Sequence, residues 1–174
     1  MLKEMVKENC KFCFMEVSSH SLSQFRVYAI KYKVGVFTNI SHDHLDYHKT
    51  FENYLRTKKS FFDSLAVDSK LIYNSDDKNS LKIVKDSNAE IKTYSIRNKT
   101  DYSCKVIEST IEGLHLKINN KEIYTRVCGE FNAYNLLAAY ATCIELNLQK
   151  EMVLIAISNI CLLYTSDAAD DVLC

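Results

Sequence analysis

The chain has 174 residues, of which 47% are hydrophobic and 25% are charged, a composition typical of a folded domain with a core of its own. Its 22 basic and 22 acidic residues give a formal net charge of zero, so no excess of positive charge favours a nucleic acid or an anionic membrane as partner. No apolar run approaches the ~20 residues of a membrane span, and the first residues lack the apolar stretch of a signal peptide. We therefore expect a cytoplasmic protein, and the sequence specifies no oligomeric state.

Cysteine usage also favours a reducing compartment. The seven cysteines are an odd number and are scattered along the chain, unlike the paired framework of a disulfide-rich secreted domain. Cys10 and Cys13 have the Cys-x-x-Cys spacing of a zinc or redox site, but no second pair follows at finger-like spacing. Since Cys13 lies in an apolar run, we interpret both as structural cysteines.

Two elements are predicted before residue 18. Residues 2–8 place their apolar side chains on one helical face, and Asn9 is expected to end this helix in the left-handed conformation. Residues 12–17, FCFMEV, are apolar except for Glu16, which is typical of a strand covered on both faces. Glu16 then lies near the carboxyl end of a strand, where α/β sheets hold their ligands, although such a residue can equally meet solvent.

A polar segment follows this predicted strand. Ser18, Gln24 and Arg26 supply a hydroxyl, an amide and a guanidinium group, which together suit an anionic, oxygen-rich ligand. A short helix then leads to an apolar strand at residues 34–37. The succession of strand, polar turn, helix and strand predicts a parallel sheet built from βαβ units.

The loop after this strand carries three of the five histidines. His42 and His44 precede Asp46 at a spacing similar to that of metallo-β-lactamase-type hydrolases, but Tyr47 stands where that family needs a ligand. We therefore disfavour a two-metal hydrolase. A loop of solvated histidines, with His48 as the third, is the structural alternative to a metal site.

A lysine interrupts the apolar stripe of the next predicted helix, residues 51–65. Lys58 falls on that stripe and Lys59 beside it. Because burying an unpaired ammonium group lowers its pKa, Lys58 either extends its head to water or becomes neutral. A neutral amine can capture carbon dioxide as a carbamate, which is an anionic oxygen ligand, and such a group could share a divalent ion with Glu16 and His44.

The rest of the chain is predicted to continue the α/β pattern. Asp76 and its polar neighbours after the second strand are expected to cap the following helix. Alternating residues with turns at 112–113 and 119–120 indicate an antiparallel meander. The predicted elements are strand 70–74, helix 79–85, strand 91–95, the meander 101–127, helix 129–147 and a helix over 151–160. The last 14 residues resemble a translated sequencing adapter, so we expect the domain over 1–160 and a non-native tail over 161–174.

Several of these residues together resemble the central domain of the Mur ligases. The resemblance covers about residues 1–160, with its motifs in the same order and at compatible spacing. The motifs are Glu16-Val-Ser-Ser-His20, Gln24-x-Arg26-Val27, Phe37-Thr-Asn39, Asp43-His-Leu-Asp-Tyr-His48, Lys58 and Gly129-x-Phe131-Asn132-x-x-Asn135-x-x-Ala138-Ala139. Within the family, the match is best to the branch that adds the third amino acid to a UDP-N-acetylmuramoyl dipeptide.

The resemblance implies an α/β fold with a mostly parallel sheet, flanking helices and a small antiparallel subsheet. It also implies an ATP-dependent amide ligase of peptidoglycan synthesis, which acts through an acyl phosphate and so serves the cell wall, cell shape and cell division. By this resemblance Mg²⁺ is held by Glu16 and His44 with a carbamylated Lys58, and these three are the catalytic residues. The same resemblance assigns the UDP-muramoyl dipeptide to Ser18, Gln24 and Arg26, and the nucleotide to Asn132 and Asn135, with Asn135 the adenine contact.

The chain also departs from the family pattern. Its three glycines, Gly35, Gly113 and Gly129, cannot form a Gly-x-x-x-x-Gly-Lys phosphate loop, so we expect the P-loop strand to precede residue 1 and the domain that binds the incoming amino acid to follow residue 160. We therefore predict that this chain alone does not ligate. Two alternatives stay open, a fragment of a folylpolyglutamate- or cyanophycin-type ligase and a non-catalytic metal-binding module. The sequence does not distinguish diaminopimelate from lysine as the added amino acid.

Overall fold

The computed structural model describes residues 2–41 and 45–160. The chain forms two compact units, which divide between Ile30 and Lys31. His42, Asp43, His44 and the predicted tail over 161–174 lie outside the described residues.

The first unit contains the helices α1 (Leu2–Lys7) and α2 (Ser19–Ser23). Asn9 follows α1 with a φ of 54°, which confirms the predicted left-handed end of this helix. Ser18 begins α2, because its hydroxyl oxygen accepts a hydrogen bond from the backbone N–H of Ser21 at 3.1 Å.

The strand predicted over residues 12–17 is wrong. This segment is an extended loop, and Phe12 and Phe14 are exposed to 45% and 65%. An apolar run becomes a strand only where a neighbour completes its ladder of backbone hydrogen bonds, and no strand of the described chain pairs with this segment. Cys13 is exposed together with Cys10, so neither packs in a core. Their interpretation as structural cysteines rather than a zinc or redox site stays a prediction.

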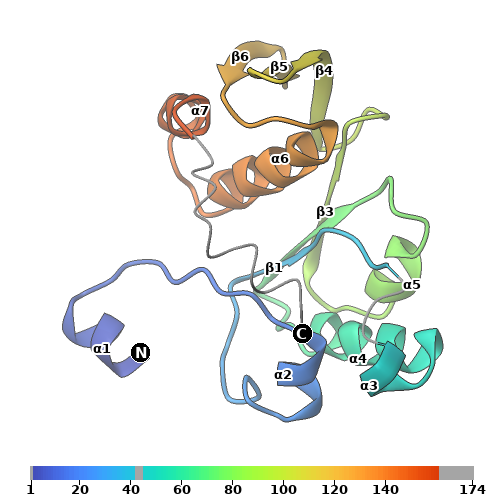
Figure 1. Cartoon of the computed structure of the whole chain (residues 1–174). Coiled ribbons are helices and arrows are strands. Elements are labelled where there is room, and N and C mark those ends of the chain that lie inside the picture. Colours follow the sequence, from blue (N-terminus) through green and yellow to red (C-terminus); the bar gives the residue numbers. More distant parts are fainter. Residues whose placement is uncertain (1, 42–44, 161–174) are drawn as a thin grey trace. The chain divides into compact units, whose positions relative to one another are not determined.

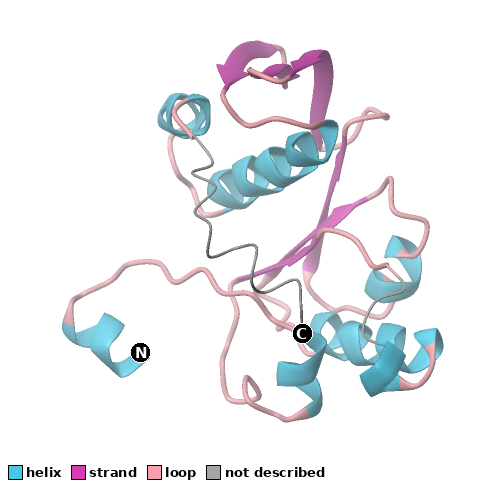
Figure 2. Cartoon of the chain, viewed as in Figure 1, coloured by secondary structure: helices cyan, strands magenta, loops and turns pink. Residues whose placement is uncertain are grey.

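The second unit is built on one sheet (Figures 1 and 2). Within the described residues its strands run in sequence order: β1 (Val34–Phe37), β2 (Lys70–Asn74), β3 (Glu90–Ser95), β4 (Tyr102–Thr110), β5 (Gly113–Ile118) and β6 (Lys121–Thr125). The pairings from β1 to β4 are parallel, whereas β4, β5 and β6 pair antiparallel. This arrangement confirms the expected mostly parallel sheet with an antiparallel subsheet.

Helices cover both faces of this sheet (Figure 1). Between β1 and β2 come α3 (Leu45–His48) and α4 (Phe51–Asp63), and α5 (Ser80–Val84) joins β2 to β3. After β6 the chain forms α6 (Glu130–Glu145), which crosses the other face, and α7 (Lys150–Ser158), which packs on α6. None of the described helices is long and apolar enough to cross a membrane.

The two faces are buried by alternate residues of the same strands. Ile72 of β2 packs in the cluster that contains Leu137 of α6, and neither side chain is exposed. On the opposite face, Phe37 of β1 meets Phe62 of α4 with ring centroids 5.9 Å apart. Burial on both faces explains why β2 reads as a continuous apolar run rather than as an alternating one.

The two turns of the antiparallel meander lie at or next to their predicted positions. Asn119 and Asn120 both have positive φ, 42° and 72°, as a two-residue hairpin turn requires, and they lie where the turn was expected. The other turn lies at residues 111–112, one residue earlier than predicted, and Gly113 already belongs to β5.

The expected cap of α5 is wrong in its details. The helix begins after Asn79, whose side chain makes no capping hydrogen bond. Asp77 instead accepts hydrogen bonds from the backbone N–H of Asn79 at 2.7 Å and from that of Ile40 at 3.2 Å. This carboxylate therefore ties the segment after β1 to the turn after β2, because both segments leave the same edge of the sheet.

Thiol labelling tests this packing. Cys104 is buried in β4, and burial raises the pKa of its thiol to about 12, whereas Cys10, Cys13 and Cys128 are exposed. At pH 8 we expect iodoacetamide to modify the exposed thiols in the folded chain and Cys104 only in denaturant, because the thiolate is the reactive form. Peptide mass spectrometry measures each site. Equal labelling rates for Cys104 and Cys10 without denaturant would contradict the described core.

Candidate functional site

The predicted site residues fall in three separate parts of the chain. Glu16, Ser18, Gln24 and Arg26 lie in the first unit, Lys58 lies on α4, and Asn132 and Asn135 lie in the first turns of α6. His44, which is predicted to complete the metal site, lies outside the described residues.

In the first unit, one predicted residue is engaged in the fold and three are exposed. Ser18 accepts the hydrogen bond that begins α2, so its hydroxyl has a structural role. Gln24 ends the same helix and donates its backbone N–H to the carbonyl oxygen of His20 at 3.0 Å. Its side chain is exposed. Glu16 and Arg26 are also exposed, so a ligand can reach all three side chains.

Lys58 lies at the margin of the buried stripe of α4. It stands three residues after Leu55 and four before Phe62, and both of these side chains are buried. Lys58 itself is half-buried. The prediction that it falls on the apolar stripe is therefore confirmed, while its protonation state stays a prediction.

The neighbouring lysine, Lys59, is held by two carboxylates. The ammonium nitrogen of Lys59 lies 2.6 Å from Oδ1 of Asp63 and 2.7 Å from Oδ2 of Asp86. Burial works against the charge, but the hydrogen bonds that Lys59 donates to these two carboxylates raise its pKa above the ordinary value. Lys59 therefore stays an ammonium ion that ties α4 to the segment after α5, and it is unsuited to react with carbon dioxide.

His48 is not one of a set of solvated histidines. It is buried at the end of α3, and its ring stacks on that of Tyr54 of α4 with centroids 5.2 Å apart. Asn53 also donates its side-chain amide to the carbonyl oxygen of His48 at 3.2 Å. This histidine therefore has a structural role in joining the two helices.

The two asparagines at the start of α6 have different surroundings. Asn132 is buried, and it donates Nδ2 to the carbonyl oxygen of Cys128 at 2.7 Å while its Oδ1 accepts from Nδ2 of Asn135 at 3.1 Å. These bonds assign the orientation of both amides. Asn132 is therefore engaged within the protein on both sides, whereas Asn135 is exposed and can contact a ligand.

Asp76 gathers four hydrogen bonds where β2 and β3 end. Its Oδ1 accepts from Oγ of Ser95 at 2.7 Å and from Nδ2 of Asn98 at 3.1 Å. Its Oδ2 accepts from the backbone N–H of Ile96 at 3.0 Å and from the hydroxyl of Tyr134 at 3.1 Å. Burial alone would raise the pKa of Asp76, but these bonds outweigh it and hold the pKa below its usual range.

Comparison with known proteins identifies the family. A family model described as the Mur ligase middle domain matches residues 1–143 and so spans both units. The chain belongs to the Mur ligase family. Residues 144–160 fold as the end of α6 and α7, and the boundary expected at residue 160 stays a prediction.

Two relatives of this Mur ligase chain carry the same enzyme name. The UDP-N-acetylmuramoyl-L-alanyl-D-glutamate–2,6-diaminopimelate ligase of Phocaeicola vulgatus is 47% identical over 160 residues, which cover 92% of this chain and 33% of the relative. The enzyme of the same name from Bacteroides thetaiotaomicron is 45% identical with the same coverage. The chain thus spans about a third of the length of these relatives.

Solved structures agree on the fold. A structure of a UDP-N-acetylmuramoyl-L-alanyl-D-glutamate–2,6-diaminopimelate ligase superposes with a TM-score of 0.82 at 25% identity, over 94% of this chain and 35% of the other. MurF from Acinetobacter baumannii superposes with a TM-score of 0.68 at 17% identity, over 76% and 30% respectively, and shows the fold alone. The α/β fold expected from the motifs is therefore confirmed.

The described part of this Mur ligase domain contains no ready-made metal site. Among those residues, no set of three or more His, Cys, Asp or Glu side chains lies close enough to hold an ion. The predicted ligands Glu16 and Lys58 lie in different units, and His44 is outside the description. Carboxylate and carbamate oxygens are ligands that suit Mg²⁺ in kind, so the metal site stays a prediction on the chemistry of its donors.

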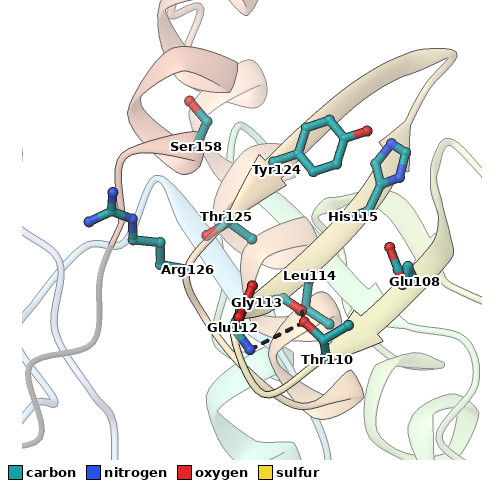
Figure 3. Close-up of a pocket in the computed structure, with 10 residues that line it drawn as sticks. All are labelled: Glu108, Thr110, Glu112, Gly113, Leu114, His115, Tyr124, Thr125, Arg126 and Ser158. Atoms are coloured by element: carbon teal, nitrogen blue, oxygen red, sulfur yellow. Dashed lines mark hydrogen bonds between the residues drawn. The ribbon is translucent and has the colours of Figure 1, made fainter.

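A cavity of about 500 Å³ opens elsewhere, over the antiparallel subsheet and the end of α7 (Figure 3). The stacked rings of His115 and Tyr124, with centroids 4.0 Å apart, form part of its wall. None of the predicted site residues lines it, so it is separate from the predicted ligand sites. The lining residues are Glu108, Thr110, Glu112, Gly113, Leu114, His115, Tyr124, Thr125, Arg126 and Ser158.

Proposed function

We propose that the protein carrying this chain is an ATP-dependent ligase of peptidoglycan synthesis. It adds the third amino acid, diaminopimelate, to UDP-N-acetylmuramoyl-L-alanyl-D-glutamate. The observation that carries this proposal is the 47% identity over 160 residues to a ligase named for that reaction. Because ATP and UDP-linked precursors are made in the cytoplasm, the proposal also favours the cytoplasm as the place of action.

The proposed reaction has two steps. A carboxylate oxygen of the dipeptide attacks the γ-phosphorus of ATP, which releases ADP and gives an acyl phosphate. The amine of the amino acid then attacks the acyl carbon, phosphate leaves and, after loss of a proton, an amide remains. Since the first step brings a carboxylate against a polyphosphate, most of the barrier is charge crowding. Mg²⁺, when bound, would supply positive charge that offsets it.

The metal-side residues are proposed from the family motif and from the chemistry of their side chains. Glu16 and His44 would hold Mg²⁺, and Lys58 would contribute an oxygen as a carbamate. To form it, the neutral amine of Lys58 attacks the carbon of carbon dioxide and loses a proton. The two carboxylates around Lys59 support Lys58 as the modified residue of this pair, because they keep Lys59 protonated.

The ligand-binding residues are proposed in the same way. Gln24 and Arg26, which are exposed, would contact the UDP-muramoyl dipeptide, and Ser18 would do so in addition to capping α2. Exposed Asn135 would contact the adenine ring, whereas Asn132 would support it through the hydrogen bond between their amides.

A reconstituted ligation assay tests the proposal. The intact gene product is incubated with ATP, Mg²⁺, the UDP-muramoyl dipeptide and diaminopimelate, and the tripeptide product is measured by mass spectrometry alongside phosphate release. We expect product only when all four are present. Replacing the dipeptide by a reduced folate and the amino acid by glutamate tests the folate-type alternative, and turnover with that pair alone would contradict the proposal.

A further inference from the structure

Helix α6 is fastened to the sheet at both ends by a tyrosine and a carboxylate. Near its start, the hydroxyl of Tyr134 donates to Oδ2 of Asp76 at 3.1 Å. At its end, Glu145 accepts from the hydroxyl of Tyr102 of β4 at 2.6 Å. The two contacts are chemically alike, and they lie at opposite ends of a helix of 16 residues.

Asp76 is a rigid anchor for the first of these contacts. Its backbone N–H donates to Oδ1 of Asn74, the last residue of β2, at 3.0 Å. Its side chain accepts from Ser95, which is completely buried at the end of β3, and from the backbone of Ile96. A carboxylate held by several donors has little freedom to turn, so the side chain of Asp76 is fixed relative to the edge of the sheet.

Tyr134 links Asp76 to the helix that bears the predicted nucleotide residues. It lies between Asn132 and Asn135 in the sequence, within the first turns of α6. Burial and the charge of Asp76 raise the pKa of Tyr134, so its hydroxyl stays a proton donor at neutral pH. Since an α-helix transmits rotation as a unit, fixing Tyr134 at the sheet edge also fixes where the amide of Asn135 is presented.

We propose that Asp76 is a positioning residue for the adenine end of the nucleotide site, and that it acts through the hydroxyl of Tyr134 by holding the start of α6 against the carboxyl edge of the sheet. This inference rests on the proposed function, because it takes Asn135 as the adenine contact. Neither Asp76 nor Tyr134 needs to touch the nucleotide.

Two matched variants of the intact protein test the inference. Tyr134→Phe and Tyr102→Phe each remove one hydroxyl that donates to a carboxylate at one end of α6. We expect both to lower the unfolding temperature, and only Tyr134→Phe to raise KM for ATP, by about five- to tenfold, with KM for the dipeptide and kcat within about twofold of the parent. The dissociation constant of a fluorescent ADP analogue provides a second readout without turnover, and it should rise by the same factor.

The outcomes separate this inference from the proposed function. A parent protein that ligates, with Tyr134→Phe and Tyr102→Phe equal in KM for ATP and in ADP affinity, overturns the positioning role alone. A parent protein that neither ligates nor binds adenine nucleotides overturns the proposed function and this inference with it. Asp76→Asn supplies a further check, because it should weaken ADP binding as Tyr134→Phe does and should add little when the two are combined.

Discussion

Replacing Lys58 with alanine is expected to lower the ligation rate of the intact protein by at least about a hundredfold. The change removes the amine on which a carbamate, and with it an anionic oxygen ligand, would form. Because Lys58 is only half-buried at the margin of the α4 stripe, its loss should leave the fold in place. Steady-state phosphate release measures the rate, and circular dichroism verifies the fold.

Lys59 provides the matched control for this prediction. Lys59→Ala removes the ion pairs with Asp63 and Asp86, and because both carboxylates face solvent the pairs contribute about 1 kcal/mol or less to stability. Activity should stay within about twofold of the parent, because this ammonium has no proposed role in the reaction. Added formate or acetate should partly restore Lys58→Ala, since a small carboxylate offers the same oxygen ligands. Full activity of Lys58→Ala would refute the assigned role.

Replacing Gly113 with alanine is expected to destabilise the second unit by about 3 kcal/mol. Gly113 opens β5 with a φ of 151°, a conformation that L side chains rarely adopt. A Cβ atom there would also lie 2.0 Å from the backbone carbonyl oxygen of Thr125 in the neighbouring strand. Backbone cannot move away as a flexible side chain can, so β5 and β6 would have to separate.

Urea unfolding followed by circular dichroism measures this effect. Glu112→Ala is the control, because this neighbouring side chain is exposed and its loss should change the free energy of unfolding by less than about 0.5 kcal/mol. If Gly113→Ala unfolds at the same urea concentration as Glu112→Ala, the described pairing of β5 with β6 is wrong.

Much of the fold could be predicted because its signals are local. The apolar run of residues 70–74 and the paired asparagines at 119–120 each carry their own structural information, and both elements lie where they were expected. The run at residues 12–17 carries the same kind of signal but forms no strand, because strand formation depends on a partner that composition does not reveal. Periodicity predicts what a segment can bury, and tertiary pairing decides whether it does.

In the candidate site, too, some residues could be predicted from the sequence and others depend on tertiary contacts. Helical spacing singles out Lys58, whereas only the resemblance to the Mur ligases assigns Asn135 to the adenine. The bond between Asp76 and Tyr134 joins residues 58 positions apart, and no periodic pattern links them. The ion pair between Lys59 and Asp86 likewise joins residues that no periodic pattern links.

Isotope transfer during ligation tests the central claim most directly. The reacting carboxylate of the UDP-muramoyl dipeptide is labelled with ¹⁸O, the intact protein is supplied with ATP, Mg²⁺ and diaminopimelate, and the released phosphate is examined by mass spectrometry. An acyl phosphate requires that one labelled oxygen leaves with the phosphate, so we expect ¹⁸O in the phosphate in step with the amide product. Phosphate without ¹⁸O, or ¹⁸O in AMP instead, would contradict the proposed ligase chemistry.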